Sequence, residues 1–242
     1  MNNKGLLFLG TSLAVGLVVS VLVASSAFYN TKKLDNVISV TGSAQQTVTS
    51  DVIKWKASFV QNIGPTEVAA GYKNIQKDFT IVQKYLQDNK ITTDELSISP
   101  ANLQPVYSYN NGTQTLTGYS IYQRIEVQSA DLSKITGLEK KAPQELSAQG
   151  ITFTNEAEEF YYTKLADLKV TMLAEATKNA QQRAAEIAKS TGRTVGDLKA
   201  ADMGVFQVTA VNSVDVSDYG SYDTSALEKQ VTAVVRSSFY IK

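Results

Sequence analysis

Three acidic residues close together, Glu156, Glu158 and Glu159, are best suited by type and spacing to acid or base chemistry. Glu156 and Glu158 would share one face of an expected strand, because side chains alternate along a strand. A carboxylate pair can serve acid/base hydrolysis or bind a hard cation. The plainer interpretation is a solvated strand end beside Tyr161 and Tyr162, since most charged runs face water.

A second acidic group, Asp215, Asp218 and Asp223, lacks the alternate spacing and the glycine of a calcium loop. These residues belong to a polar segment, 212–228, that is rich in Ser, Asp and Tyr. We interpret this segment as a long loop or an interaction arm. We therefore assign no catalytic, cofactor-binding or metal-binding residue, and we expect no cofactor.

The composition excludes several classes of chemistry. The 242 residues include no His and no Cys, which excludes disulfides, thiolate nucleophiles, histidine-ligated haem, zinc sites with N or S ligands and imidazole-based triads. No S-x-x-K motif and no phosphate-binding glycine loop occurs. Lys plus Arg and Asp plus Glu both number 23, so the chain has no long-range field for nucleic acid.

Tyrosine is frequent, with 12 residues, and several gather at Tyr107, Tyr109, Tyr119 and Tyr122. Such a group can stack on a sugar or a base. We favour packing within a sheet or a contact between subunits, because tyrosine joins an apolar body to a hydrogen-bonding tip.

The N-terminal segment carries no charge from Gly5 to Thr31, and 6–24 is almost wholly apolar. A bilayer core of about 30 Å needs roughly 20 helical residues, whereas signal peptides have apolar cores of about 7 to 15. We expect residues 5–27 to be an uncleaved transmembrane anchor. The alternative is a signal peptide cleaved after Ala27, where small residues precede the junction.

Residues 1–4 would then form a short cytoplasmic tail and 28–36 a juxtamembrane linker. The positive charges scarcely set the orientation, because Lys4 on one side opposes Lys32 and Lys33 on the other. We place the N-terminus in the cytoplasm because the preceding tail is very short and the large domain resembles exported cargo.

Hydrophobic periodicity predicts the remaining elements. Helices are expected at 66–88, 131–149 and 163–191, from apolar residues three and four apart. Asp131 is a plausible N-cap, Pro143 a break and Gly150 a stop, and Gly192 ends the last helix. The alanine-rich half of that helix can approach a sheet or another helix closely.

Strands are expected at 51–60, 105–116, 116–128, 150–160, 203–211 and 229–242. Asn111-Gly112 predicts a tight hairpin turn, since both central residues need positive φ. The same residues with Thr113 match a glycosylation acceptor, but the turn already explains them. The order predicts an α+β fold: a mixed, mostly antiparallel sheet packed with about three helices, after one N-terminal transmembrane helix. No linker divides the part after the anchor.

These segments resemble a known family. ISVTGSAQQTVTSDVIKWKASF is similar to its opening strand pair, and ITTDELSISPANLQPVYSYNNGTQTLTGYSIYQRIEVQSADLSKI is similar to its central stretch. The alanines four apart, Ala176 to Ala188 before Gly192, and the closing VTAVVRSSFYIK also match. Residues 37–242 thus resemble a SIMPL domain of the bacterial type. Departures occur at Ser50-Asp51, where the family often has Pro-Asp, and at DTSALEKQ, which replaces a common Pro-Gly turn.

The resemblance implies an exported protein of the bacterial cell envelope, linked to oxidative-stress defence, in a family with some ring-like homo-oligomers. It supplies no catalytic residues. We expect a non-enzymatic protein that self-assembles through this domain, anchored in the inner membrane by a single span with its C-terminal domain in the periplasm. The alternative is an envelope module that binds a small ligand or a peptide at a sheet edge, with 212–225 as a clasp. A carboxylate-dependent hydrolase using Glu156 or Glu158 is a third hypothesis.

Overall fold

The computed structural model describes residues 3–33 and 36–242. Residues 1–2 of the expected tail and 34–35 of the expected linker lie outside this description. The elements in chain order are α1 (Asn3–Lys33), β1 (Val37–Thr49), β2 (Val52–Ile63), α2 (Val68–Asp88), η1 (Thr93–Glu95), β3 (Leu96–Ile98), β4 (Asn102–Asn110), β5 (Thr113–Ser129), α3 (Leu132–Ser147), β6 (Thr152–Asn155), β7 (Glu159–Tyr161), α4 (Leu165–Ser190), β8 (Val195–Met203), β9 (Gln207–Ala210), β10 (Ser221–Tyr222) and β11 (Glu228–Ile241).

The fold is α+β with mostly antiparallel sheets, as expected, and α1 is an apolar helix. Its segment Leu7–Tyr29 has a mean hydropathy of 2.4 and is long enough to cross a membrane. None of that segment is buried against other described residues. A 23-residue apolar helix with no protein cover is suited to hydrocarbon rather than to water.

The chain forms two compact units, each assembled from separate stretches. Unit 1 comprises residues 1–45, 169–206 and 232–242, and unit 2 comprises residues 46–168 and 207–231. Two of the four divisions fall within β1 and β11, one falls in the first turn of α4, and one falls between β8 and β9. A search of the sequence for polar connecting segments therefore has no signal from which to find the three divisions that interrupt a strand or a helix.

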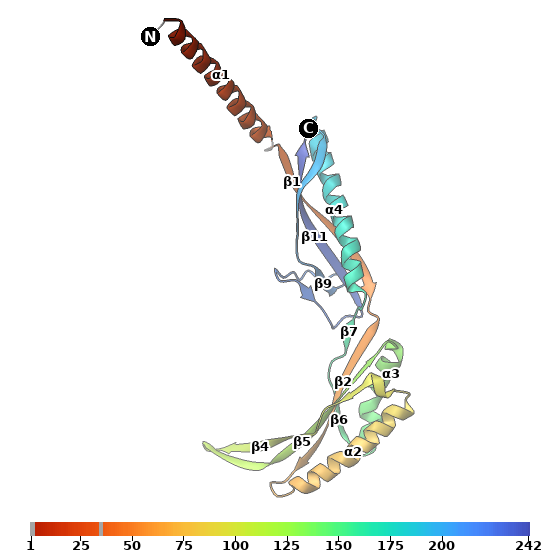
Figure 1. Ribbon diagram of the computed structural model, residues 1–242. Helices are drawn as coiled ribbons and strands as arrows, with labels where there is room; N and C mark the ends of the chain where they lie inside the picture. Colours follow the sequence, from red (N-terminus) through yellow and green to blue (C-terminus); the bar gives the residue numbers. More distant parts are fainter. Residues whose placement is uncertain (1–2, 34–35) are drawn as a thin grey trace. The chain divides into compact units, whose positions relative to one another are not determined.

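Unit 2 contains a six-stranded sheet with the order β3-β5-β2-β6, in which β4 also pairs with β5 and β7 with β2. Helices α2 and α3 lie on one face of this sheet (Figure 1). Alternation along β2 turns Ile53, Trp55, Ala57 and Phe59 toward those helices, and all four are fully buried. They form the main core with Ile75 and its neighbours on α2 and with Ile135 and its neighbours on α3.

The turn between β4 and β5 has the predicted geometry. Asn111 has φ 47° and Gly112 has φ 77°, as a two-residue hairpin of the favoured type requires. The paired strands run from Asn102 opposite Tyr122 to Asn110 opposite Thr113. The hairpin extends away from α2 and α3 (Figure 1).

The prediction that Pro143 breaks its helix is wrong. The helix runs through Pro143, and Asp131 caps it as predicted by accepting a hydrogen bond from the Lys134 amide at 3.0 Å. Proline has no N–H for the carbonyl four residues earlier, which belongs to Glu139. The Asn155 side-chain amide donates to that carbonyl at 2.7 Å. An external donor thus replaces the missing helical bond.

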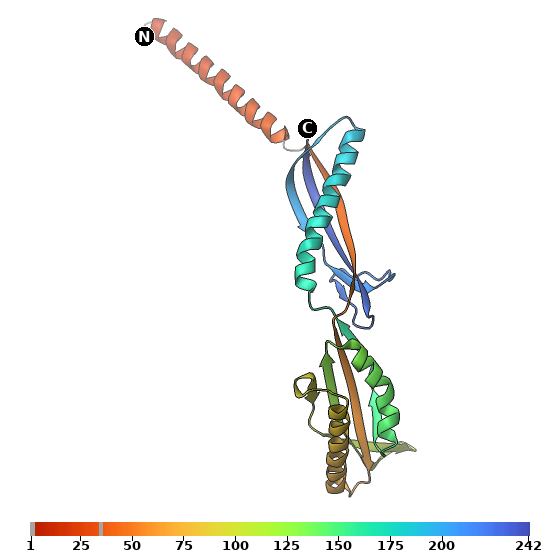
Figure 2. The ribbon, with the colours of Figure 1, turned by 90° about the vertical axis from the view of Figure 1, so that its right-hand side faces the viewer.

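In unit 1, α4 from Lys169 onward packs against strands β1 and β11, and β8 pairs with β11 (Figure 2). Val40, Ala180, Ala184 and Phe239 form its buried cluster. A Cβ at Gly42 would lie 2.1 Å from the Ala176 carbonyl oxygen, so the strand and the helix touch through their backbones. The close approach predicted from the alanine stripe is confirmed.

Several strands differ from expectation. The strand predicted at 150–160 is two strands, β6 and β7, separated at residues 156–158. Strands β3, β8 and β10 were not expected, because β3 and β10 have only three and two residues and β8 lacks clear apolar alternation. Strands β9 and β10 pair in parallel, with Ser221 opposite Gln207, and belong to the sheet ordered β1-β11-β9-β10.

Candidate functional site

The face of the unit 2 sheet that points away from α2 and α3 carries charged residues. Because β2 alternates, Lys54, Lys56 and Ser58 face the opposite side from its buried residues. The register with β5 places Lys56 opposite Glu126 and Ser58 opposite Arg124. The strand pairing therefore gathers residues of both charges on one open face.

Three ion pairs occur on this face. Lys54 Nζ lies 3.0 Å from Glu126 Oε1, and Lys56 Nζ lies 2.6 Å from Glu159 Oε1. The third pair, Arg124 with Glu156, is looser, with 3.7 Å between Nε and Oε1. All six side chains keep some exposure to water, so each pair contributes little to stability.

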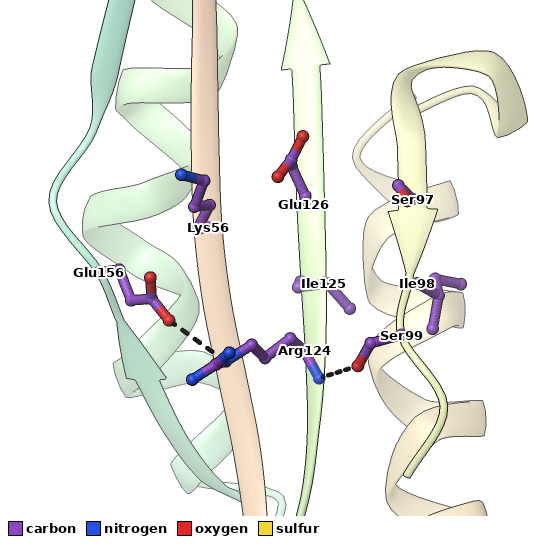
Figure 3. Close-up of a pocket in the computed structure, with 8 residues that line it drawn as sticks. All are labelled: Lys56, Ser97, Ile98, Ser99, Arg124, Ile125, Glu126 and Glu156. Atoms are coloured by element: carbon purple, nitrogen blue, oxygen red, sulfur yellow. Dashed lines mark hydrogen bonds and ion pairs between the residues drawn. The ribbon is translucent and has the colours of Figure 1, made fainter. Parts of the chain in front are cut away.

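A shallow hollow of about 370 Å³ lies on the same face between β2, β3 and β5 (Figure 3). Its lining consists of Lys56, Ser97, Ile98, Ser99, Arg124, Ile125, Glu126 and Glu156. Figure 3 shows the Arg124 side chain reaching across β2 toward Glu156. The Arg124–Glu156 ion pair is loose, and the lining of the hollow contains both cationic and anionic side chains. Such a lining suits a small zwitterion or a peptide backbone better than a singly charged ligand.

Ser99, one of the two serines that line the hollow, has its hydroxyl engaged in hydrogen bonds. The Ser99 hydroxyl donates to the Pro100 carbonyl at 3.1 Å and accepts from the Arg124 amide at 3.0 Å. A serine engaged in this way has no base to remove its proton. The arrangement can bind a ligand, but it does not provide covalent catalysis through this serine.

The three glutamates of the sequence analysis have separate partners. Glu156 faces Arg124 on the open face, while Glu158 lies near Thr136, Glu139 and Lys140 of α3. The expectation that Glu156 and Glu158 share a face is wrong, because residues 156–158 lie between two strands and do not alternate. They therefore do not form a carboxylate pair for hydrolysis.

Glu158 and Glu159 have opposite electrostatic surroundings. Burial, followed by the nearby charge of Glu139, raises the pKa of Glu158, and its Oε1 is buried without a hydrogen-bond partner among the described residues. The hydrogen bond from Lys56, followed by that from the Tyr161 hydroxyl, lowers the pKa of Glu159. The bond to Glu159 also raises the pKa of Tyr161 to about 12. Glu159 is thus an ionised structural partner rather than a proton donor.

Two of the three aspartates of segment 212–228, Asp215 and Asp223, accept hydrogen bonds from the loop itself. Asp215 accepts from the Ser213 hydroxyl at 3.0 Å, and Asp223 accepts from the Ser225 and Ala226 amides, both at 2.9 Å. Across residues 3–33 and 36–242, no group of three acidic side chains is placed to hold a metal ion.

Lys229 was missed by the sequence analysis. It is fully buried, and its ammonium donates to the carbonyls of Asp223 at 2.5 Å and Ala226 at 2.7 Å. Burial lowers its pKa, against the opposing attraction of Asp223. The sequence pattern could have identified it as buried, because Lys229 falls in phase with the inward-facing Val231, Ala233 and Val235 of the same strand.

The rest of the same segment is a closed loop that exposes three large side chains, Val214, Val216 and Tyr219, among polar ones. The Gln207 side chain holds its base by donating to the Ser217 carbonyl at 2.6 Å and accepting from the Ser221 hydroxyl at 2.8 Å. Val214, Val216 and Tyr219 are 92%, 84% and 98% exposed. The interpretation as a long loop is confirmed between β9 and β10, while a role as an interaction arm stays a prediction.

The four tyrosines do not form one stacked cluster. Tyr107 and Tyr109 lie on β4, and Tyr119 and Tyr122 lie on β5 opposite Pro105 and Asn102. The Tyr122 ring lies 5.4 Å from the Arg124 guanidinium carbon and its hydroxyl accepts from Gln104 at 3.4 Å.

Comparison with protein families agrees with this architecture. The SIMPL family model, described as a protein of unknown function (DUF541), matches residues 38–239. The chain therefore belongs to the SIMPL family, with the matched region beginning just after the apolar helix. No curated protein matches the chain.

Proposed function

We propose that this chain is a non-enzymatic, membrane-anchored protein of the cell envelope that self-assembles through its SIMPL domain. The observation that carries the proposal is the hairpin of β4 and β5. No charged residue occurs from Leu96 to Gln123. Exposed edge strands that avoid self-association usually carry charges.

The hairpin is also poorly covered. Every residue of β4 except Leu103 is exposed, and Val106, Tyr107 and Tyr109 are 43%, 46% and 73% exposed. An isolated two-stranded ribbon is marginally stable in water. Pairing with a second copy would cover its apolar side chains and use the edge of β4 that pairs with no other described strand, although Pro105 removes one backbone donor there.

Membrane anchoring supports assembly by a separate physical effect. Chains held by α1 in one bilayer are confined to a plane, which raises their effective concentration. Weak lateral contacts then suffice to close a symmetric ring. We assign the anchor to the inner membrane, with the N-terminus in the cytoplasm and the SIMPL domain in the periplasm.

Assembly can be tested on the full-length protein in detergent by light scattering after size-exclusion chromatography. We expect an oligomer that dissociates when Val106 and Tyr109 are both changed to Lys, because charge on an edge opposes pairing. A matched variant with Gln76→Lys and Gln87→Lys on the exposed side of α2 should assemble normally. An unmodified protein that is monomeric over a wide concentration range would refute the proposal.

The location and the physiological role need their own tests. Single cysteines introduced into this cysteine-free chain should react with a membrane-impermeant maleimide in intact spheroplasts when placed in the domain, but not when placed at Asn3. For the role, the family resemblance suggests that loss of the protein sensitises cells to peroxide. Normal peroxide survival of a deletion strain would remove that part of the proposal.

A second candidate function is binding of a small zwitterion or a peptide at the hollow of Figure 3. The observation that favours it is the loose Arg124–Glu156 pair beside a lining of both charges. Changing Arg124 to Gln should abolish binding of a peptide selected against the domain, while Lys73→Gln should not. Loss of binding on deleting residues 212–225, with assembly intact, would assign it to the loop instead.

A further inference from the structure

A second hollow, which we name the α4 hollow, lies in unit 1 beside the C-terminal half of α4. It has a volume of about 500 Å³. Its polar lining residues are Lys178, Gln181, Gln182, Lys189, Arg193 and Thr194. Three cations, two amides and one hydroxyl surround it, and no carboxylate lines it. This donor set suits an anion.

The charges of the three cations are not paired within the part of the chain that the structure describes. No ion pair formed within residues 3–33 and 36–242 includes Lys178, Lys189 or Arg193. Arg183, on a different side of α4, instead donates to the Thr41 carbonyl at 3.0 Å and is part of the packing of unit 1. The cations of the hollow are thus available for a ligand.

The hollow lies at the end of unit 1 where the chain enters from α1. Val195, on its rim, pairs with Ile241, and the Ile241 amide donates to the Asn36 carbonyl at 3.0 Å. From Lys33 to Asn36 the chain spans at most about 11 Å. The helical residues from Tyr29, the end of the apolar segment, to Lys33 add about 6 Å.

We propose that the α4 hollow binds the phosphate of an anionic phospholipid headgroup in the membrane that holds α1. The inference rests on the proposed anchoring, because the short tether brings the hollow within reach of the headgroup layer. Basic residues next to a span are attracted to anionic lipid. Free phosphate offers the same chemistry, but the tether favours the lipid, which is held permanently near the site.

Two of the three cations have another physical role. Lys189 and Arg193 lie at the C-terminal end of α4, where positive charge stabilises a helix. Their replacement would lower the stability of unit 1 by that route whatever the lipid. A test must therefore measure dependence on lipid rather than stability alone.

The experiment uses full-length protein in lipid nanodiscs with Ser190→Cys as a unique attachment site for a fluorophore. Headgroup-nitroxide lipids serve as the quencher, and discs of zwitterionic phosphatidylcholine are compared with discs containing phosphatidylglycerol. We expect at least about a twofold greater quenching with phosphatidylglycerol, reduced by salt. The variant K178Q/K189Q/R193Q should lose this difference, whereas K73Q/K77Q/K141Q, which removes three exposed lysines of unit 2, should keep it.

Each outcome decides the matter. Equal quenching in the two lipids, or an unchanged difference in K178Q/K189Q/R193Q, overturns the headgroup site while leaving the anchoring intact. Abolition of the difference by moderate inorganic phosphate at constant ionic strength would assign the hollow to the free ion instead. A chain that does not co-purify with the discs refutes the anchoring, and the headgroup site with it. Retention of the difference by K178R/K189R would support recognition through positive charge.

Discussion

The Asn155 side-chain amide donates to the main-chain carbonyl of Glu139 at 2.7 Å, which is the acceptor that Pro143 leaves without its helical donor. The same amide group accepts from Trp55 Nε1 at 3.2 Å. One side chain on β6 therefore permits a proline inside α3 and satisfies a buried indole on β2. This relationship joins three elements of unit 2 and sets the first prediction.

Replacing Asn155 by Ala should lower the free energy of unfolding by about 2 to 4 kcal/mol, because two buried polar groups lose their partners. Adding Pro143→Ala should restore part of this loss, since the new N–H can bond to the Glu139 carbonyl. Chemical denaturation of the two single variants and the double variant measures the coupling. Strictly additive effects would contradict the role assigned to Asn155.

The contact between Gly42 and α4 gives the second prediction. Gly42→Ala places a Cβ 2.1 Å from the Ala176 carbonyl oxygen, so unit 1 should lose about 2 kcal/mol or more. Gly137→Ala on α3 is the control, because its Cβ meets nothing within 4 Å and alanine favours a helix by about 0.5 to 1 kcal/mol. Thermal unfolding should shift in opposite directions for the two variants.

Glu95 gives a pH-dependent prediction. The hydrogen bond from Ser129, followed by that from the Thr92 amide, lowers the pKa of Glu95 from 4.5 to about 2, with further help from Lys134. Since folding favours its ionised form, its contribution is complete above pH 4.5 and is lost as the pH falls toward 2. We expect a loss of about 1 to 3 kcal/mol across this range.

Glu95→Gln should be less stable than the unmodified protein at pH 7 and nearly equal to it at the acid end of the range. Denaturant titrations at several pH values measure both curves. Asp94→Asn, a change at the exposed neighbour, should leave the pH dependence almost unchanged. Parallel curves for Glu95→Gln and the unmodified protein would show that another group is responsible.

The buried Lys229 gives the fourth prediction. Lys229→Met keeps the length of the side chain but leaves the Asp223 and Ala226 carbonyls without their donor. Residues 223–227 should then exchange amide hydrogen faster by about tenfold or more, corresponding to about 1 to 3 kcal/mol of lost local stability. Hydrogen exchange with mass spectrometry measures this, and Lys169→Met serves as the control. Unchanged exchange would mean that the two carbonyls are satisfied in another way.

Several features of the fold were predictable because a local pattern was sufficient. Three helices, the Asn111-Gly112 turn and the Asp131 cap follow from spacing, left-handed backbone preference and capping. Strands β3 and β8 were not predictable, because their pairing with β5 and β11 forms them rather than their own pattern. Pro143 was misjudged because the compensating donor, Asn155, lies on another element.

The candidate site was less predictable than the fold. The acidic residues Glu156, Glu158 and Glu159 were found by sequence, but their partners Arg124, Thr136 and Lys56 come from other elements. Lys229 could have been identified as an inward-facing lysine on a strand. The hollow of Figure 3 is lined by residues from distant parts of the chain, which only packing brings together, whereas the α4 hollow is lined by residues 178–195, which are neighbours in sequence.

The sequence by itself determined the apolar N-terminal helix, the absence of histidine and cysteine chemistry, the family and most of the elements. These depend on composition and on interactions between residues near each other in the chain. Only the tertiary structure decided the division into two discontinuous units, the separate partners of the three glutamates and the hollow on the unit 2 sheet. Strand register and helix packing set these features, since they bring together side chains that are far apart in sequence.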